Sequence, residues 1–168
     1  QVASSGDVDL VKGYRDIRSL FDNEKLDLVV LCTPSGLHAE QAILAAKRGV
    51  HVVSEKPMAT RYEDGLRMVR ACDAAGVRLF VVKQNRRNAT LQLLKRAVEE
   101  DRFGNIKLVH LNVFWTRPKE YYGDSWRGTW EFDGGAFMNQ ASHYVDLVQW
   151  LIGPVQHVQA MTSTTRKI

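Results

Sequence analysis

The chain has 168 residues, of which 45% are hydrophobic and 25% are charged, a composition typical of a soluble globular protein. Its formal net charge is +4, but the basic residues are scattered and often stand beside acids, so no basic stripe predicts nucleic-acid binding. No apolar run reaches the length of a membrane span and no signal peptide opens the chain, so we expect a cytoplasmic protein without membrane contact. Cys32 and Cys72 lie in apolar surroundings without metal-ligand spacing, and we expect both to be buried free thiols.

The first half of the chain alternates between short apolar runs and amphipathic segments. After a short helix over 14–21, the pattern predicts buried strands over 28–32, 50–54 and 79–82. Between them we expect an alanine-rich helix over 37–48 and a second helix that Thr60 caps, with Glu63 completing a capping box and Gly76 ending it. Strand, helix, strand, helix, strand in this order predicts a βαβαβ unit, which is a parallel sheet with right-handed crossovers.

The second half follows a different pattern. Asn88 is expected to cap a helix that Gly104 ends, and residues 106–116 alternate like a half-exposed strand of an antiparallel sheet. A loop rich in rings and charge over 117–132 leads to a helix from Gly135 to Leu151 and a second alternating strand over 155–164. We therefore expect an α/β fold: a parallel βαβαβ part over 1–86, followed by an incomplete α+β open-sheet domain over 87–168.

Polar side chains stand at the ends of two of the expected parallel strands. The strand through Val52 and Val53 runs directly into Glu55-Lys56-Pro57, and ligands of open α/β sheets lie beyond the carboxyl ends of the strands. The turn Thr33–His38 leads from the preceding strand into a helix N-terminus, which favours an anionic ligand. The alternatives are a solvated strand end with an unimportant Glu-Lys pair, and a turn of the kind that every βα unit has.

The helix after Gly135 carries a second set of polar residues. Asn139, His143 and Asp146 fall at i, i+4 and i+7 and share one face, separate from a packing stripe that begins at Phe137. A catalytic base needs an orienting partner, and this spacing supplies an amide and a carboxylate. A structural histidine with satisfied hydrogen bonds is the alternative. One histidine, one amide and one carboxylate are too few ligands for a metal, so no metal site is expected.

Three segments in this order resemble the Gfo/Idh/MocA family of NAD(P)-dependent sugar and cyclitol dehydrogenases. They are Leu31–Ser35 followed by His38, then Glu55-Lys56-Pro57, then Gly134-Gly135 leading to His143 and Asp146. The resemblance implies that residues 1–86 are the C-terminal part of a Rossmann domain and that residues 87–168 begin a substrate and oligomerisation domain. It also implies that the chain is an internal piece that starts after the glycine-rich loop.

The resemblance assigns roles by position. Lys56 is similar to the lysine that contacts both the nicotinamide ribose and the reacting hydroxyl, and His143 to the catalytic base. Asn139 completes this catalytic set, although many members carry an aspartate there. A cis Lys56-Pro57 bond is implied as well. The cofactor, NAD or NADP, is expected to contact Thr33, Pro34, Ser35, His38, Glu55, Lys56 and Gln84.

Residues 126–130 and 138–143 resemble a narrower branch, the UDP-N-acetylglucosamine-uronate 3-dehydrogenases of bacterial lipopolysaccharide and other surface-polysaccharide biosynthesis. The implied reaction oxidises a secondary alcohol of a UDP-linked N-acetylated uronic acid, bound by Lys56, Arg86, Trp126, Arg127, Asn139, Gln140 and His143. Surface charge is the alternative interpretation of each arginine. A cyclitol or free-sugar dehydrogenase, or a non-catalytic binding or assembly protein, are the other functions considered. The outer face of residues 106–116 predicts a homo-oligomer, a dimer or tetramer formed through the C-terminal sheet.

Overall fold

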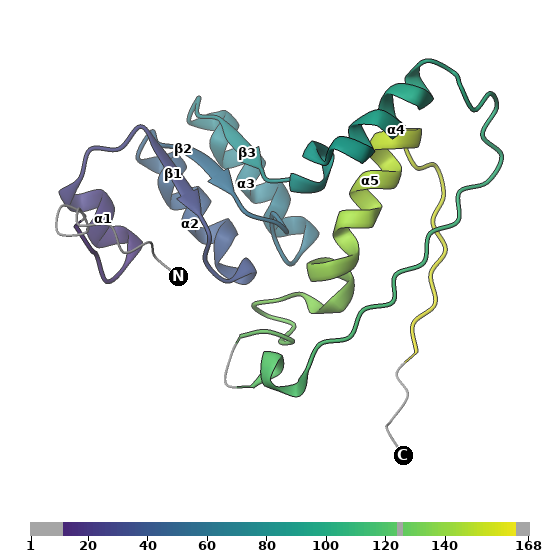
Figure 1. The fold of residues 1–168 in the computed structure, drawn as a ribbon. Helices are drawn as coiled ribbons and strands as arrows, with labels where there is room; N and C mark the ends of the chain where they lie inside the picture. The colour runs from purple at the N-terminus through teal and green to yellow at the C-terminus, as the bar shows by residue number, and fades with distance from the viewer. Residues whose placement is uncertain (1–11, 124–125, 164–168) are drawn as a thin grey trace, which may run out of the picture. The chain divides into compact units, whose positions relative to one another are not determined.

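The structure is a computed structural model that describes residues 12–123 and 126–163. The chain forms two compact units, and the elements are labelled in Figure 1. The first unit comprises the chain up to Val82 together with Arg117–Asn139, and the second comprises Lys83–Thr116 together with the chain from Gln140 onward. Within the described residues, no helix has both the length and the apolar composition to cross a bilayer. The domain boundary after residue 86 stays a prediction.

A parallel sheet is the centre of the first unit. Its strands are β1 (Leu28–Leu31), β2 (His51–Ser54) and β3 (Leu79–Val81), in the order β1-β2-β3. Helix α2 (His38–Lys47) connects the first pair and α3 (Tyr62–Ala74) the second, because parallel neighbours need a crossover. The predicted βαβαβ unit is confirmed (Figure 1).

Small residues allow α2 to lie close to the sheet. Ala42 and Ala45 are fully buried, and they pack in one cluster with Val52 of β2 and Met68 of α3. Helices α2 and α3 also contact each other. The core of this unit therefore lies between the two helices and one face of the sheet.

The opposite face of the sheet is exposed, which corrects the prediction of buried strands. The register aligns Val30 with Val53 and Val53 with Phe80, so the three side chains form one row across the sheet. Val30 is 55% exposed and Phe80 is 52% exposed. The apolar runs gave no sign of this asymmetry, because a strand covered on one face and a strand covered on both can have the same composition.

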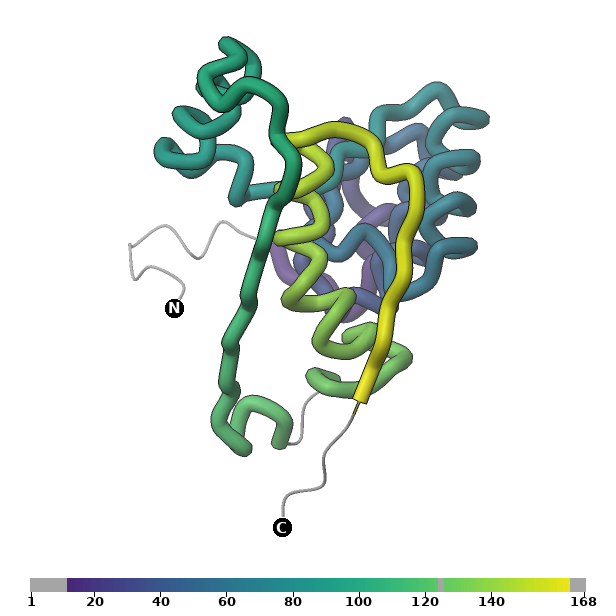
Figure 2. Tube along the Cα trace, turned by 90° about the vertical axis from the view of Figure 1, so that its right-hand side faces the viewer, coloured from purple at the N-terminus to yellow at the C-terminus, as the bar shows by residue number. Residues whose placement is uncertain are grey.

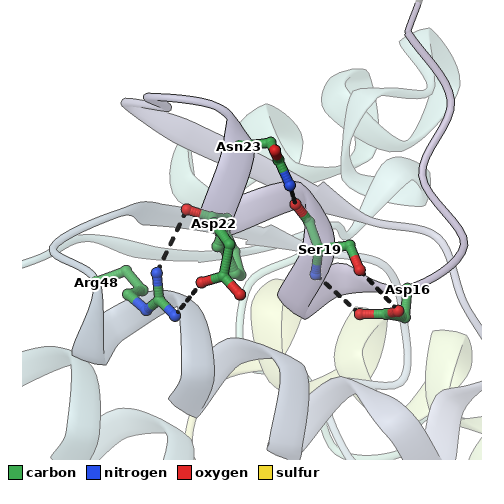
Figure 3. A network of polar contacts seen from close by, with 6 residues as sticks. Asp16, Ser19, Asp22, Asn23 and Arg48 are labelled. Atoms are coloured by element: carbon green, nitrogen blue, oxygen red, sulfur yellow. Dashed lines mark hydrogen bonds and ion pairs between the residues drawn. The ribbon is translucent and has the colours of Figure 1, made fainter.

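Helix α1 (Ile17–Asn23) begins where Asp16 caps it, later than expected (Figure 3). The Asp16 carboxylate accepts from the Ser19 N–H at 2.9 Å and from the Ser19 hydroxyl at 2.9 Å. Arg48, at the end of α2, donates to the Asp22 carboxylate at 2.6 Å and anchors α1 (Figure 3).

The expected capping box of α3 is wrong. Arg61 is the N-cap residue, in an extended conformation and without a side-chain cap bond. Thr60 instead donates its hydroxyl hydrogen to the Glu131 carbonyl at 3.4 Å. The side chain expected to start α3 thus joins this strand-to-helix connection to the segment before the Gly134-Gly135 pair.

Two helices organise the second unit. Asn88 accepts from the Thr90 N–H at 3.0 Å and begins α4 (Ala89–Glu99), which confirms the predicted cap; the helix ends before the expected Gly104. Helix α4 contacts α5 (Ser142–Ile152), and the short helix η3 (Gln84–Arg87) contacts both. The π-helix η5 (Phe137–Ala141) runs directly into α5, and a short turn of 3-10 helix, η4 (Lys119–Tyr122), lies in the aromatic loop.

The two predicted strands of the second half are absent from the described residues. Residues 106–116 and 155–163 run as extended segments in Figure 2 but pair with no strand, and Thr164 lies outside the described residues. The alternation itself is present: Val113 is 37% exposed, whereas its neighbour Phe114 is 89% exposed. Side-chain alternation follows from the extended backbone, whereas a strand also needs a hydrogen-bonded partner, which sequence periodicity does not report.

Candidate functional site

The exit of β2 places a lysine at the carboxyl edge of the sheet. The Glu55 N–H donates to the Leu31 carbonyl at 3.0 Å, so the exit continues alongside the end of β1. The Lys56 N–H donates to the Glu55 carboxylate at 3.1 Å, and the Lys56-Pro57 peptide bond is cis, as expected. Both Glu55 and Lys56 are half-buried.

The ammonium of Lys56 is held by Asn139. Its Nζ donates to the backbone carbonyl of Asn139 at 2.8 Å and to the side-chain Oδ1 of the same residue at 2.9 Å. Both residues belong to the first unit although 83 positions separate them in the chain. A lysine with two defined acceptors is more than a solvated strand end, so this geometry favours the functional interpretation.

A buried aspartate that the sequence pattern did not single out lies behind Asn139. The Asn139 Nδ2 donates to Oδ1 of Asp133, and the Gly128 N–H donates to Oδ2 at 2.8 Å. Asp133 is 4% exposed and Asn139 is 7% exposed. The hydrogen bonds form a chain from Lys56 through Asn139 to Asp133. The signal for it in the sequence is a carboxylate directly before two glycines.

His38 connects the Thr33–His38 turn to the Glu55-Lys56-Pro57 segment that follows β2. The ring is 1% exposed; Nδ1 lies 2.9 Å from the Pro57 carbonyl oxygen and Nε2 lies 2.9 Å from the Thr33 carbonyl oxygen. Since both nitrogens face backbone, the structure gives His38 a positioning role, and its cofactor contact stays a prediction. Ser35 is also buried, whereas Thr33 is exposed and donates its hydroxyl hydrogen to Gln41 at 2.6 Å.

The same turn receives the segment that carries Asp133. The Gly36 N–H donates to the Phe132 carbonyl at 3.0 Å. A Cβ atom on Gly36 would lie 2.2 Å from the Glu131 carbonyl oxygen, so only glycine allows this approach. The Thr33–His38 turn, the Glu55-Lys56-Pro57 segment and residues 131–133 are thereby held together within the first unit.

Helix α5 buries the polar face that carries His143. His143 is 9% exposed, Asp146 is 8% exposed and Leu147 is 6% exposed. The expected packing stripe is wrong at its start, because Phe137 is 70% exposed. The π-helix η5 has more residues per turn than an α-helix, and this shifts the face on which the following residues lie. Gln140, in the same π-helix, is half-buried.

Arg86 binds Asp146 within the second unit, and its predicted substrate contact stays a prediction. Its Nε donates to Oδ2 at 2.8 Å and its Nη2 to Oδ1 at 2.6 Å, and Lys83 Nζ lies 3.7 Å from the same Oδ1. The hydrogen bonds to Asp146 raise the pKa of Arg86. A bidentate pair of this kind fixes η3 on α5. Gln84, also in η3, is exposed.

The aromatic loop gathers arginines around rings within the first unit. The Arg127 guanidinium lies 5.0 Å from the centroid of Tyr121 and 5.3 Å from that of Trp126, and Arg117 lies 5.3 Å from Tyr121. These are cation–π distances, so part of the loop packs on its own rings. Trp130 is 83% exposed.

Comparison with known proteins decides which family the chain represents. Residues 1–83 match the model of the oxidoreductase family with an NAD-binding Rossmann fold, and residues 91–168 match that of the GFO/IDH/MocA C-terminal domain. The levoglucosan dehydrogenase of Pseudarthrobacter phenanthrenivorans is 33% identical over 155 residues, which is 89% of this chain and 39% of that protein. The chain belongs to the GFO/IDH/MocA family. The family and fold class predicted from sequence are confirmed.

Solved structures from this family include two with high identity. The WlbA dehydrogenase of Bordetella pertussis, in complex with NADH and UDP-GlcNAcA, is 67% identical with a TM-score of 0.81, over 84% of this chain and 41% of that one. The WlbA dehydrogenase of Chromobacterium violaceum, with the same two ligands, is 64% identical with a TM-score of 0.82, over 85% of this chain and 42% of that one. The chain therefore spans about two fifths of the length of the relatives it matches.

Proposed function

We propose that the protein carrying this chain is an NAD-dependent dehydrogenase that oxidises a secondary alcohol of a UDP-linked, N-acetylated uronic acid. The observation that carries the proposal is the Lys56 ammonium, held by two oxygens of Asn139 at the carboxyl edge of the sheet. The identity of 67% and 64% to proteins solved with NADH and UDP-GlcNAcA supports this substrate class.

The residues at the sheet edge fit a dinucleotide. Thr33 supplies an exposed hydroxyl after β1, and Glu55 and Lys56 supply a carboxylate and an amine after β2. Because Leu31 and Ser54 are register partners, the three groups stand at the same edge of the sheet. A carboxylate and an amine near one another suit the hydroxyls of a ribose, which both donate and accept hydrogen bonds. When bound, NAD supplies the acceptor for the hydride.

Lys56 and His143 have different roles toward the substrate hydroxyl. Lys56, as an ammonium, donates toward the substrate oxygen and stabilises the negative charge that develops on it; charge stabilisation of this kind commonly contributes most to the rate enhancement of an enzyme. His143 accepts the hydroxyl proton as general base, a contribution of about 10²–10⁴ in rate. Asn139 holds the Lys56 side chain in place by accepting two hydrogen bonds from Nζ. The proposal requires that Lys56 and His143 reach the same hydroxyl.

The remaining assignments belong to this proposal and are predictions. They are the catalytic and binding residues by number, the domain boundary after residue 86, the homo-oligomer, the cytoplasmic location and the role in surface-polysaccharide biosynthesis. Arg86, Trp126, Arg127 and Gln140 are retained as proposed substrate contacts, and Arg86 also binds Asp146.

The test is NADH formation by the purified protein that contains this chain, measured with NAD and a panel of sugars. We expect turnover with UDP-GlcNAcA and little with UDP-GlcNAc, a matched control that lacks only the carboxylate. Turnover with levoglucosan or myo-inositol instead would still show a dehydrogenase, but it would refute the proposal that the substrate is a nucleotide sugar. Tight NADH binding without turnover of any sugar would favour the non-catalytic binding protein.

A further inference from the structure

We propose that Asp133 is a positioning residue for Lys56, acting through Asn139. This inference rests on the proposed function, in which Lys56 donates to the reacting hydroxyl. Asn139 itself is neutral. The structure places a buried carboxylate one hydrogen bond further from the lysine.

The carboxylate of Asp133 determines which way the amide of Asn139 points. An ionised carboxylate only accepts hydrogen bonds, and Asp133 accepts one from the Gly128 N–H at 2.8 Å and one from Asn139 Nδ2. The NH₂ end of the amide must therefore face Asp133. Its Oδ1 is then directed at Lys56, where it lies 2.9 Å from Nζ. Without an acceptor at residue 133, the NH₂ group of Asn139 would lose this hydrogen-bond partner inside the protein, because the Lys56 ammonium is itself only a donor.

The same arrangement brings a negative charge to the end of the hydrogen-bond chain. Asp133 is 4% exposed, so water screens its charge poorly. Hydrogen bonds to an ionised group are shorter and stronger than neutral ones, and bonds in a chain polarise each other. The Asn139 amide thus carries part of the effect of the Asp133 charge to Lys56.

Two glycines make this placement possible. Gly134 and Gly135 have φ angles of +75° and +78°, a conformation that side-chain-bearing residues rarely adopt. The chain reverses there, so Asp133 comes within hydrogen-bond reach of Asn139 although it precedes the π-helix. A Cβ on Gly135 would also lie 2.9 Å from the ring of Trp130. The conformation of Asp133-Gly134-Gly135 therefore brings the Asp133 carboxylate into hydrogen-bond contact with Asn139.

The first test is Asp133→Asn in the protein that contains this chain. The new side chain has one oxygen for two donors, so either the Gly128 N–H or the Asn139 amide loses its acceptor. We expect kcat with UDP-GlcNAcA to fall by about tenfold or more, equivalent to about 1.4 kcal/mol of transition-state stabilisation. The KM for the sugar should change by less than about threefold, because the interaction acts on the reacting hydroxyl.

The second test exchanges the two side chains in the double variant Asp133→Asn/Asn139→Asp. The amide now at position 133 accepts from the Gly128 N–H and donates to the carboxylate now at position 139. That carboxylate accepts from Lys56, so every hydrogen bond is restored. The single Asn139→Asp change sets two carboxylates against each other and should be impaired. We expect the double variant to recover most of the kcat that either single variant loses. Equal loss in the double variant and in Asp133→Asn would overturn the proposal.

A third measurement does not depend on turnover. Competitive acetylation followed by mass spectrometry gives the reactivity of Lys56 relative to that of Lys47, which is exposed on α2. Asp133→Asn should make Lys56 several-fold more reactive, and the double variant should return it to the wild-type value.

Unchanged reactivity and unchanged kcat in Asp133→Asn would each overturn the proposal. If wild type turns over no sugar of the panel, the proposed function fails, and acetylation still decides whether Asp133 acts on Lys56. If Asp133→Asn does not fold, the proposal is tested by comparing the kcat of Asn139→Asp with that of the double variant, which should be higher.

Discussion

Replacing Gly36 by alanine is expected to separate the turn after β1 from the segment that carries the lysine's partners. A Cβ at this position would lie 2.2 Å from the Glu131 carbonyl oxygen and 2.9 Å from the Phe132 Cα. Both contacts are with backbone, so no side-chain rotation relieves them. The segment has to move away from the turn, and the bond from the Gly36 N–H to the Phe132 carbonyl is lost.

The size of the effect follows from the steric clash and the lost hydrogen bond. Overpacking of this kind costs about 1–3 kcal/mol, and loss of one backbone hydrogen bond costs about 1 kcal/mol. Gly36→Ala should therefore lower the free energy of unfolding by about 2–4 kcal/mol. It should also lower kcat, because Asp133 and Asn139 follow directly on the displaced segment.

Urea unfolding of the protein that contains this chain measures the first effect, and the NADH assay measures the second. Gly13→Ala is a matched control, since nothing lies within 4 Å of a Cβ there. We expect the control to stay within about 0.5 kcal/mol of wild type. A Gly36→Ala protein as stable and as active as the Gly13→Ala control would refute the close approach of the two segments.

Two further changes test other parts of the structure. Asp146→Asn leaves the Arg86 guanidinium facing a neutral amide, and water compensates in part because Arg86 is 40% exposed. We expect the free energy of unfolding, measured with urea, to fall by about 1–2 kcal/mol. No measurable decrease would contradict the structural role of this pair. Burial raises the pKa of the Cys72 thiol, so less of it is thiolate at neutral pH, whereas Cys32 is exposed. A thiol reagent followed by peptide mass spectrometry should therefore label Cys32 in the native protein and Cys72 only after unfolding; equal native labelling would contradict the described burial.

The first half of the fold was predictable because its signals are local. Apolar runs, an alanine-rich stretch and Gly76 at a helix end determine strands and helices within a few residues of one another, and the structure has the predicted parallel order. Whether a strand is covered on both faces depends on distant segments, so the exposure of Val30 was not predicted. The exposure of Cys32, expected to be buried, was missed for the same reason: the residue follows directly after β1, at the edge of the sheet.

The site was predictable where a side chain stands at a strand end, and unpredictable where it depends on a fold-back. The place of Lys56 follows from the rule that ligands lie at the carboxyl edge of the sheet. The bond from Lys56 to Asn139 joins segments 83 positions apart, and no periodicity reports such a contact. Asp133 was missed because its partner is reached through two left-handed glycines. The ion pair of Arg86 with Asp146 was also missed, because a sequence shows a charge without its partner.

We propose that the amine of Lys56 and the imidazole of His143 both act in the chemical step. Single-turnover measurement of NADH formation from UDP-GlcNAcA in Lys56→Ala and His143→Ala, each shown to bind NADH and to unfold like wild type, tests it most directly. We expect each variant to lose at least about 10²-fold in the rate of the chemical step. A near-normal rate in either variant, with the protein folded and NADH bound, would contradict the account.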